Sequence, residues 1–260
     1  MVGDIQHIII IQSLEPDEKQ TGAELYDDVV NRRIEQLGDR SFIKSQAYFS
    51  ANSKAEILAF LDNILNDINN RQNGLVIHFE MHGSSHLDGL ITADGELISW
   101  LELVTKFRLI NIATQNQLYL TMATCYGRYL FEGVDPELKS PYSGYISASQ
   151  SVTVQEVMDS FGDVFERLIA DGNLIRSYLA SDAEGGRFFY KDSKTTFEQL
   201  MEHIIDRMRN DPSFKEEVLD HPALIMGKNM GIIDDAGLDY MMGKALADIY
   251  QRHKKAFEFE

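Results

Sequence analysis

Leu75-Val-Ile-His-Phe-Glu-Met-His82 and Leu118-Tyr-Leu-Thr-Met-Ala-Thr-Cys125 are two apolar runs that each end in a reactive side chain. Both have the length and the continuous apolar character of strands that are buried on two faces. If they are neighbouring strands of one parallel sheet, their carboxyl ends lie at the same edge, where ligands gather in such sheets. A histidine and the only cysteine of the chain would then lie side by side. These are the two groups that a cysteine nucleophile with its base requires.

Strand and helix patterns alternate on either side of these two runs. The patterns predict strands over residues 7–14, 41–49, 75–82, 118–124 and 143–149, and helices over residues 23–37, 53–69, 100–112 and 153–170. The segment 89–98, with Ala93-Asp94-Gly95 at its centre, predicts a hairpin. We therefore expect an α/β/α sandwich with a mostly parallel central sheet over residues 1–195, and a helical C-terminal extension over residues 196–260 that packs on it.

Composition narrows the class of partner. The chain has 260 residues, of which 24 are basic and 41 acidic, so its formal net charge is −17. A surface of this sign disfavours binding to nucleic acid or to anionic lipid. We expect a protein or peptide substrate, a possible regulatory protein partner, and neither a nucleic acid nor a membrane as a partner.

Cysteine use and apolar segments indicate the compartment. One cysteine cannot form an intrachain disulfide, which fits a reducing environment. The N-terminal residues lack a basic leader and a small-residue cleavage site, and no apolar run reaches about 18 residues. We therefore expect a cytoplasmic protein without a membrane span.

The two reactive residues imply a definite chemistry. A thiol beside an imidazole is partly ionised, the thiolate is the nucleophile, and the imidazolium then protonates the leaving amine. Gly83, directly after the histidine, lets a substrate carbonyl approach the backbone closely. The backbone N–H groups of Gly83 and Cys125 are therefore candidate oxyanion donors.

The order of these elements resembles a known family. An apolar strand that ends in His82-Gly83, followed by an apolar strand that ends in Ala123-Thr-Cys125, resembles the caspase-like (clan CD) cysteine peptidases. The Asp-Gly hairpin that starts at Asp88, directly after the histidine, is most similar to the bacterial CHAT-domain peptidases. The resemblance covers residues 5–190. It implies a caspase-like fold and a cysteine endopeptidase with Cys125 as nucleophile and His82 as general base and acid, with Gly83 contributing to the oxyanion site.

The resemblance also implies regulation without a cofactor. Relatives are held inactive until a partner binds, and the corresponding connection after the nucleophile, residues 131–145, is where caspases are cleaved or rearranged. Some clan members respond to calcium, for which Asp88, Asp94 and Glu96 would be ligands to test. No cofactor or resident metal is expected.

Substrate preference has two interpretations. Asp88, Asp94 and Glu96 could line an acidic pocket for arginine or lysine, whereas Arg128 could favour an acidic residue. Ser147, Ser149 and Gln150 follow the next strand, where clan members shape this pocket. The acidic surface favours basic substrates.

Two other classes of protein fit the same residues. A buried and inert Cys125 would make the chain a catalytically silent adaptor with the same fold, because cysteine is among the most buried residue types. His78, Glu80 and His82 share one face of a strand and His86 follows, so a metal-dependent hydrolase is a third alternative. Glu80 is better placed to orient a histidine than to bind a metal.

Overall fold

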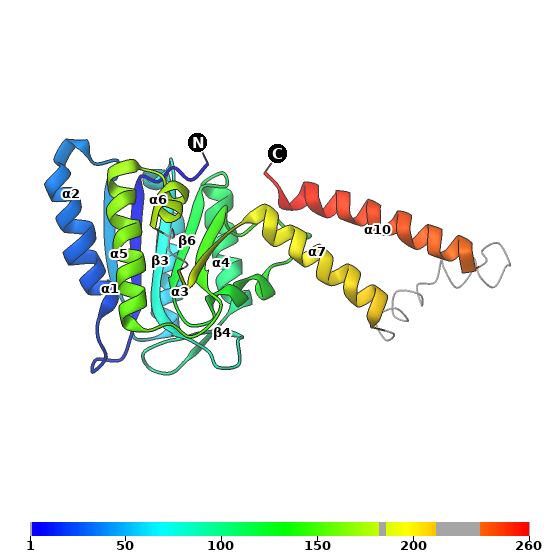
Figure 1. The fold of residues 1–260 in the computed structure, drawn as a ribbon, viewed down its shortest axis with the longest axis horizontal. Coiled ribbons are helices and arrows are strands. Elements are labelled where there is room, and N and C mark those ends of the chain that lie inside the picture. The colour runs from blue at the N-terminus through cyan, green and yellow to red at the C-terminus, as the bar shows by residue number, and fades with distance from the viewer. Residues whose placement is uncertain (1, 182–185, 212–234, 260) are drawn as a thin grey trace. The chain divides into compact units, whose positions relative to one another are not determined.

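The β-branched run near the N-terminus forms the fully buried strand β1 (His7–Ser13), and the sheet is built outward from it. In the computed structural model, which describes residues 2–181, 186–211 and 235–259, the strand order is β2-β1-β3-β6-β7-β8 (Figure 1). The other strands of this path are β2 (Ser45–Ser50), β3 (Leu75–Gly83), β6 (Leu118–Ala123), β7 (Gly144–Ala148) and β8 (Phe188–Asp192). In this order, each strand from β2 across to β7 pairs in parallel with the next.

The edges of the sheet differ. Strand β2 forms one edge, and its residues are partly buried or exposed. At the other edge, β8 pairs antiparallel with β7, and the sequence patterns did not predict this strand. Phe188 of β8 is buried, with its ring centroid 4.6 Å from that of Phe161. Tertiary packing therefore stabilises a strand in a short segment whose sequence pattern does not predict one.

The predicted hairpin forms at the carboxyl end of β3. Strands β4 (Gly89–Ile91) and β5 (Leu97–Ser99) pair antiparallel, and Gly95 in the turn adopts a φ of 85°, which glycine tolerates best. Strand β4 also pairs antiparallel with the end of β3, with His82 opposite Ile91 and Gly83 opposite Leu90. The hairpin therefore holds the segment that carries the predicted histidine.

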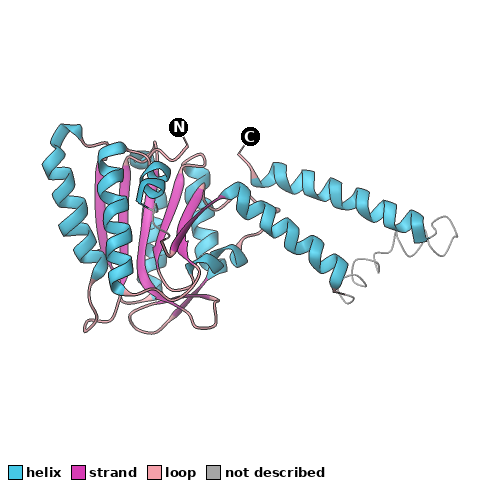
Figure 2. Cartoon of the chain, in the orientation of Figure 1, coloured by secondary structure: helices cyan, strands magenta, loops and turns pink. Residues whose placement is uncertain are grey.

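Helices cover both faces of the sheet (Figures 1 and 2). One continuous helical segment consists of α1 (Thr21–Glu24), the π-helical η1 (Leu25–Asn31) and α2 (Arg32–Leu37), and it lies on the same face as α5 (Val154–Asp171) and α6 (Leu174–Ser181). The opposite face carries α3 (Lys54–Asn66) and α4 (Trp100–Ala113). The short 3-10 segments are η2 (Gly38–Arg40), η3 (Ile68–Arg71) and η4 (Gly127–Gly133). The predicted α/β/α arrangement with a mostly parallel sheet is confirmed.

Alternation along β3 sends successive side chains to opposite faces. The ring of His78 contacts Phe161 of α5 at a centroid distance of 4.7 Å. The next residue, Phe79, packs against Phe107 of α4 at 5.5 Å. His82 therefore leaves the sheet on the same face as His78, toward α1 and α5.

The chain divides into two units, one of Met1–Val134 with Ser140–Ser193 and the other of Asp135–Lys139 with Lys194–Glu260. The second unit contains α10 (Asp235–Phe257) and, apart from its first residue, α7 (Ser193–Asn210). Inside it, Phe197 packs against Phe257 with ring centroids 5.4 Å apart, and His253 pairs with Glu137 at 3.2 Å. None of the helices within the described residues is both long and apolar enough to span a membrane.

Candidate functional site

The register between β3 and β6 brings the two predicted reactive residues to one place. The strands are adjacent and parallel, and Glu80 is the partner of Ala123 at the last pair of the ladder. His82 and Cys125 each follow two residues after this pair. They therefore leave the sheet at the same edge and on the same face.

A cavity of about 250 Å³ opens at this position. It lies beyond the carboxyl ends of three parallel strands, and both His82 and Cys125 line it. The remaining lining residues are Leu14, Glu18, Lys19, Thr21, Glu80, Met81, Ala123, Val152, Thr153, Val154 and Val157. The cavity thus combines an apolar wall with a thiol, an imidazole and two carboxylates, a composition typical of small-molecule or side-chain binding sites.

The backbone around Cys125 is closely constrained. A side chain at Gly83 would collide with the carbonyl oxygen of Cys125, so the end of β3 and the cysteine loop are packed backbone against backbone. The next residue, Tyr126, adopts a φ of 60°, which is uncommon outside glycine and turns the chain sharply. Its N–H donates to the carbonyl oxygen of Gln150 at 3.4 Å. These contacts fix the partly exposed Cys125 at the cavity wall.

The N-terminus of α5 forms another wall of the cavity. Thr153 is the N-cap and makes a capping box with Glu156, while Val154 and Val157 line the cavity. The hydrogen bonds that Glu156 accepts from Thr153 lower the pKa of Glu156 below its ordinary value. The N-terminal end of an 18-residue helix also favours nearby negative charge, as on a thiolate or an oxyanion.

His82 has an acidic partner that the sequence analysis missed. Its Nε2 lies 2.7 Å from Oε1 of Glu18, a residue of the loop between β1 and α1. A signal was present in the sequence, because this loop follows a central strand and therefore opens at the same sheet edge as the histidine.

Glu80 orients the buried His78 rather than His82. His78 Nε2 lies 2.9 Å from Glu80 Oε1, His78 Nδ1 lies 2.8 Å from Thr121 Oγ1, and Thr21 donates its hydroxyl to Glu80 Oε2 at 2.8 Å. All four side chains are buried. The chain of hydrogen bonds joins β6, β3 and α1 beneath the cavity, so that each buried polar group has a partner.

The five predicted substrate-binding residues are not among those that line the cavity. Asp88 and Arg128 are exposed, and the Arg128 guanidinium lies over the Tyr129 ring at 5.7 Å. Ser147 is buried in β7, Ser149 is partly exposed, and Gln150 contacts the cysteine loop through its carbonyl oxygen. The segment that follows Gln150, and not these residues, contributes the cavity wall.

The acidic hairpin residues are engaged elsewhere. Asp94 accepts a hydrogen bond from the Thr92 hydroxyl at 2.5 Å, and Glu96 accepts one from the backbone N–H of Lys54 at 3.0 Å. Neither Asp94 nor Glu96 lines the cavity. Across the part of the chain that the structure describes, no group of three histidine, cysteine, aspartate or glutamate side chains is arranged to hold a metal ion.

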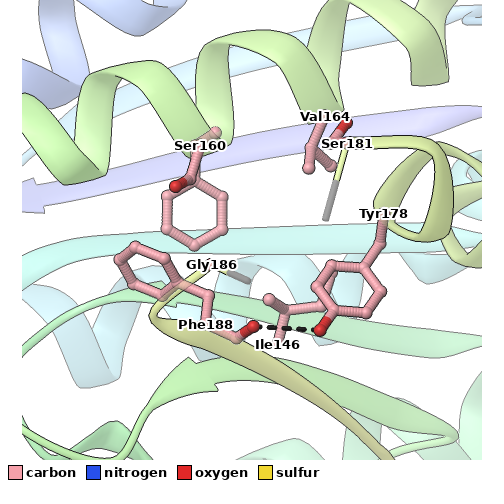
Figure 3. A pocket seen from close by; sticks show the side chains of 8 residues that line it. Ile146, Ser160, Val164, Tyr178, Ser181, Gly186 and Phe188 are labelled. Carbon is pink, nitrogen blue, oxygen red and sulfur yellow. Dashed lines mark hydrogen bonds between the residues drawn. The ribbon is translucent and has the colours of Figure 1, made fainter. Parts of the chain in front are cut away.

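A second cavity, of about 40 Å³, lies between α5, α6 and β8 (Figure 3). It is mostly apolar, and in Figure 3 the Tyr178 hydroxyl donates to the carbonyl oxygen of Phe188, at 2.9 Å. Its lining contains no histidine, cysteine or carboxylate. The cavity beside Cys125 is therefore the candidate site for chemistry.

Sequence comparison finds no protein-family model and no curated protein that matches this chain. Among solved structures, the chain is similar to iotapain, a secreted C11 cysteine protease from Bacteroides thetaiotaomicron, with a TM-score of 0.45 and 11% sequence identity. The match covers 80% of this chain and 72% of that chain. Similarity at this level assigns no activity.

Proposed function

We propose that this protein is a cysteine endopeptidase of the caspase-like clan, similar to the CHAT-domain peptidases. The observation that carries the proposal is that Cys125 and His82 line one cavity at the carboxyl ends of two adjacent parallel strands. A nucleophile and a base at such an edge, next to a helix N-terminus, supply the groups that acyl transfer uses.

The reaction follows from the chemistry of these groups. The thiol proton of Cys125 passes to the imidazole of His82, and the thiolate attacks the carbonyl carbon of the scissile bond. The backbone N–H groups of Gly83 and Cys125 are the proposed donors to the oxyanion. When the C–N bond breaks, the leaving amine takes the proton from His82, and a thioester remains on Cys125. Water then attacks the thioester carbonyl and gives a proton to His82. The C–S bond breaks, the product leaves as a carboxylic acid, and His82 returns the proton to the Cys125 thiolate.

We further propose that the substrate is a protein or peptide with a basic residue before the cleaved bond. Glu18 and Glu80 supply negative charge to the cavity, and the net charge of the chain is −17. Lys19, which also lines the cavity, is paired with Glu24 at 3.0 Å, so its charge is partly compensated. The negative potential of the cavity would attract the guanidinium or ammonium group of such a residue.

Regulation through the second unit is also part of the proposal. The segment Asp135–Lys139 begins shortly after the cysteine loop, yet it belongs to the second unit. Glu137 pairs with His253, and the Lys139 ammonium donates to the carbonyl oxygen of Glu258. A protein that binds α10 would act on this segment, and the covalent chain leads from there to Cys125.

The direct test is the reactivity of Cys125. Because the chain has one cysteine, alkylation by iodoacetamide, followed by mass spectrometry, reports that thiol alone. We expect wild-type protein to react faster than a free peptide thiol near pH 7. The variant His82→Ala should slow alkylation to the rate of a free thiol, by roughly tenfold or more, because a free thiol is only a few per cent ionised near pH 7. The same protein should cleave a peptide library after basic residues.

The matched control is His86→Ala, which removes an exposed histidine four residues away that does not line the cavity. It should react at the wild-type rate. A Cys125 that reacts no faster than a free thiol and is insensitive to His82→Ala would overturn the peptidase proposal in favour of a catalytically silent adaptor.

A further inference from the structure

We propose that Glu18 is the positioning residue for His82, so that the site works as a carboxylate–imidazole–thiol triad; this inference rests on the proposed function. Glu18 Oε1 lies 2.7 Å from His82 Nε2, a distance typical of a charge-assisted hydrogen bond. Both side chains line the cavity that Cys125 also lines. The two side chains are 35% and 55% exposed, respectively.

The Glu18 carboxylate is fixed at its other oxygen as well. Glu18 Oε2 accepts a hydrogen bond from the backbone N–H of Glu15 at 2.9 Å. The backbone N–H of Glu18 in turn donates to the carbonyl oxygen of Glu15 at 3.1 Å. The carboxylate is therefore held within its own turn, with one oxygen presented to the imidazole.

The loop itself is anchored to the interior of the sheet. Gln12, a buried residue of β1, donates from Nε2 to Oε1 of Gln20 at 2.5 Å. Gln20 then donates from its own Nε2 to the carbonyl oxygens of Glu15 at 2.8 Å and Glu18 at 2.9 Å. These three side-chain amide hydrogen bonds fix the loop that carries Glu18 relative to the strand β1.

The beginning of α1 is tied to the same glutamine. Gln12 Oε1 accepts a hydrogen bond from the backbone N–H of Ala23 at 3.0 Å. A side chain at Gly22 would lie 2.8 Å from that oxygen and 3.0 Å from Cγ of Glu80, so the close approach of α1 to the sheet needs glycine. One buried residue of β1 thus holds both the last residue of the loop and the first turn of α1.

This arrangement has a chemical consequence. A carboxylate can only accept a hydrogen bond, so the pairing places a proton on Nε2 of His82 and leaves the lone pair on Nδ1. Nδ1 is then the nitrogen that takes the proton of Cys125. The imidazolium formed in that step carries a positive charge beside the negative charge of Glu18, and Nδ1 later gives its proton to the leaving amine as the C–N bond breaks.

If Glu18 only stabilised the fold, its substitution would lower the stability of the protein and leave the reactivity of Cys125 in the folded protein unchanged. An exposed ion pair contributes little to the stability of a fold, because water and salt screen it. A substitution at Glu18 should therefore leave the unfolding transition nearly unchanged. If Glu18 positions His82, however, the same substitution must change the reactivity of Cys125.

The experiment compares Glu18→Gln and Glu18→Asp with Asp17→Asn, which removes an adjacent exposed charge from the same loop. Glu18→Gln should lower the alkylation rate of Cys125 by roughly threefold, a smaller loss than for removal of the base itself. It should also change the shape of the rate-against-pH profile. Glu18→Asp should restore part of the rate, and Asp17→Asn should match wild type in rate, pH profile and unfolding midpoint.

The outcomes separate this inference from the proposed function. If Glu18→Gln behaves like Asp17→Asn while His82→Ala abolishes the enhanced rate, the positioning role is refuted and the peptidase proposal stands. If Glu18→Gln lowers the rate only in proportion to a lowered fraction of folded protein, the role is structural and the inference fails. If wild-type Cys125 reacts like a free thiol, both proposals fail together.

Discussion

Two histidine–glutamate pairs involve the same face of β3, and they differ in almost every physical respect. The pair of His78 and Glu80 lies inside the molecule, where the side chains are 0% and 3% exposed. The pair of His82 and Glu18 lies at the sheet edge, with side chains 55% and 35% exposed. The two N···O distances are similar, at 2.9 Å and 2.7 Å, so distance alone does not distinguish them.

The difference shows how environment assigns different roles to the same chemical pair. In the interior, the cost of removing polar groups from water is offset only when each group is fully hydrogen-bonded, and Thr21 and Thr121 complete the set for His78 and Glu80. At the edge, water solvates the pair, which therefore contributes little to stability and leaves the imidazole accessible to a substrate. The buried pair supports the fold, whereas the exposed pair supports the proposed chemistry.

The largest effect on stability should come from His78→Ala. The substitution leaves the Glu80 carboxylate buried without its imidazole and opens a void beside Phe161. Breaking a buried pair by removing one partner costs roughly 3–5 kcal/mol of unfolding free energy. Urea unfolding followed by circular dichroism measures this loss, and the milder Glu80→Gln should lose about 1–3 kcal/mol. A His78→Ala loss within the range of a surface substitution would contradict the structural role of the buried pair.

A much smaller stability change is expected for His82→Ala. The exposed pair is worth about 0–1 kcal/mol, so the urea midpoint should scarcely move. The same variant should nevertheless lose the enhanced alkylation rate of Cys125. The urea midpoint and the alkylation rate should be measured on one preparation, so that the loss of reactivity can be compared with the loss of stability. A large loss of stability for His82→Ala would mean that the edge pair is structural too.

The smallest effect concerns a third pair, Lys54 with Glu102, which is also partly exposed. The hydrogen bonds from Lys54 and Ser99 lower the pKa of Glu102 to about 2 from the ordinary value of 4.5. Because the folded-state pKa is depressed, the stabilising contribution of Glu102 is fully present above pH 4.5 and is lost as the pH falls toward 2. The thermal midpoint of Glu102→Gln should therefore lie below that of wild type at pH 6, and the gap should close at low pH. A gap that stays constant down to pH 2 would contradict this linkage.

Local patterns were sufficient to predict most of the sheet. The runs at His7, Leu75 and Leu118 predicted buried strands because a strand covered on both faces must be continuously apolar, and all three are central in the sheet. The hairpin around Gly95 was predicted because a turn depends on a few adjacent residues. The positions of His82 and Cys125 at one edge of the sheet were predicted from the ends of their strands.

Contacts between distant segments were beyond the reach of these patterns. The sequence analysis offered Asp88, Arg128, Ser147, Ser149 and Gln150 as substrate-binding residues, whereas the cavity is lined by the loop of Glu18 and by the N-terminus of α5. Which loop turns over a sheet edge depends on helix packing and hydrogen bonds, here those of Gln12. Neither the strand β8 nor the inclusion of Asp135–Lys139 in the second unit was predicted, for the same reason.

The amino-acid sequence by itself determined the alternation of strands and helices, the parallel sheet, and the placing of His82 and Cys125 at strand ends, because apolar periodicity and the position of a residue in its strand are local properties. Only the tertiary structure decided that Glu80 is hydrogen-bonded to His78 and that Glu18 is hydrogen-bonded to His82. Those pairings depend on strand register and on the approach of α1 and its preceding loop to the sheet. Such approaches are set by packing among residues far apart in the chain, which no short stretch of sequence encodes.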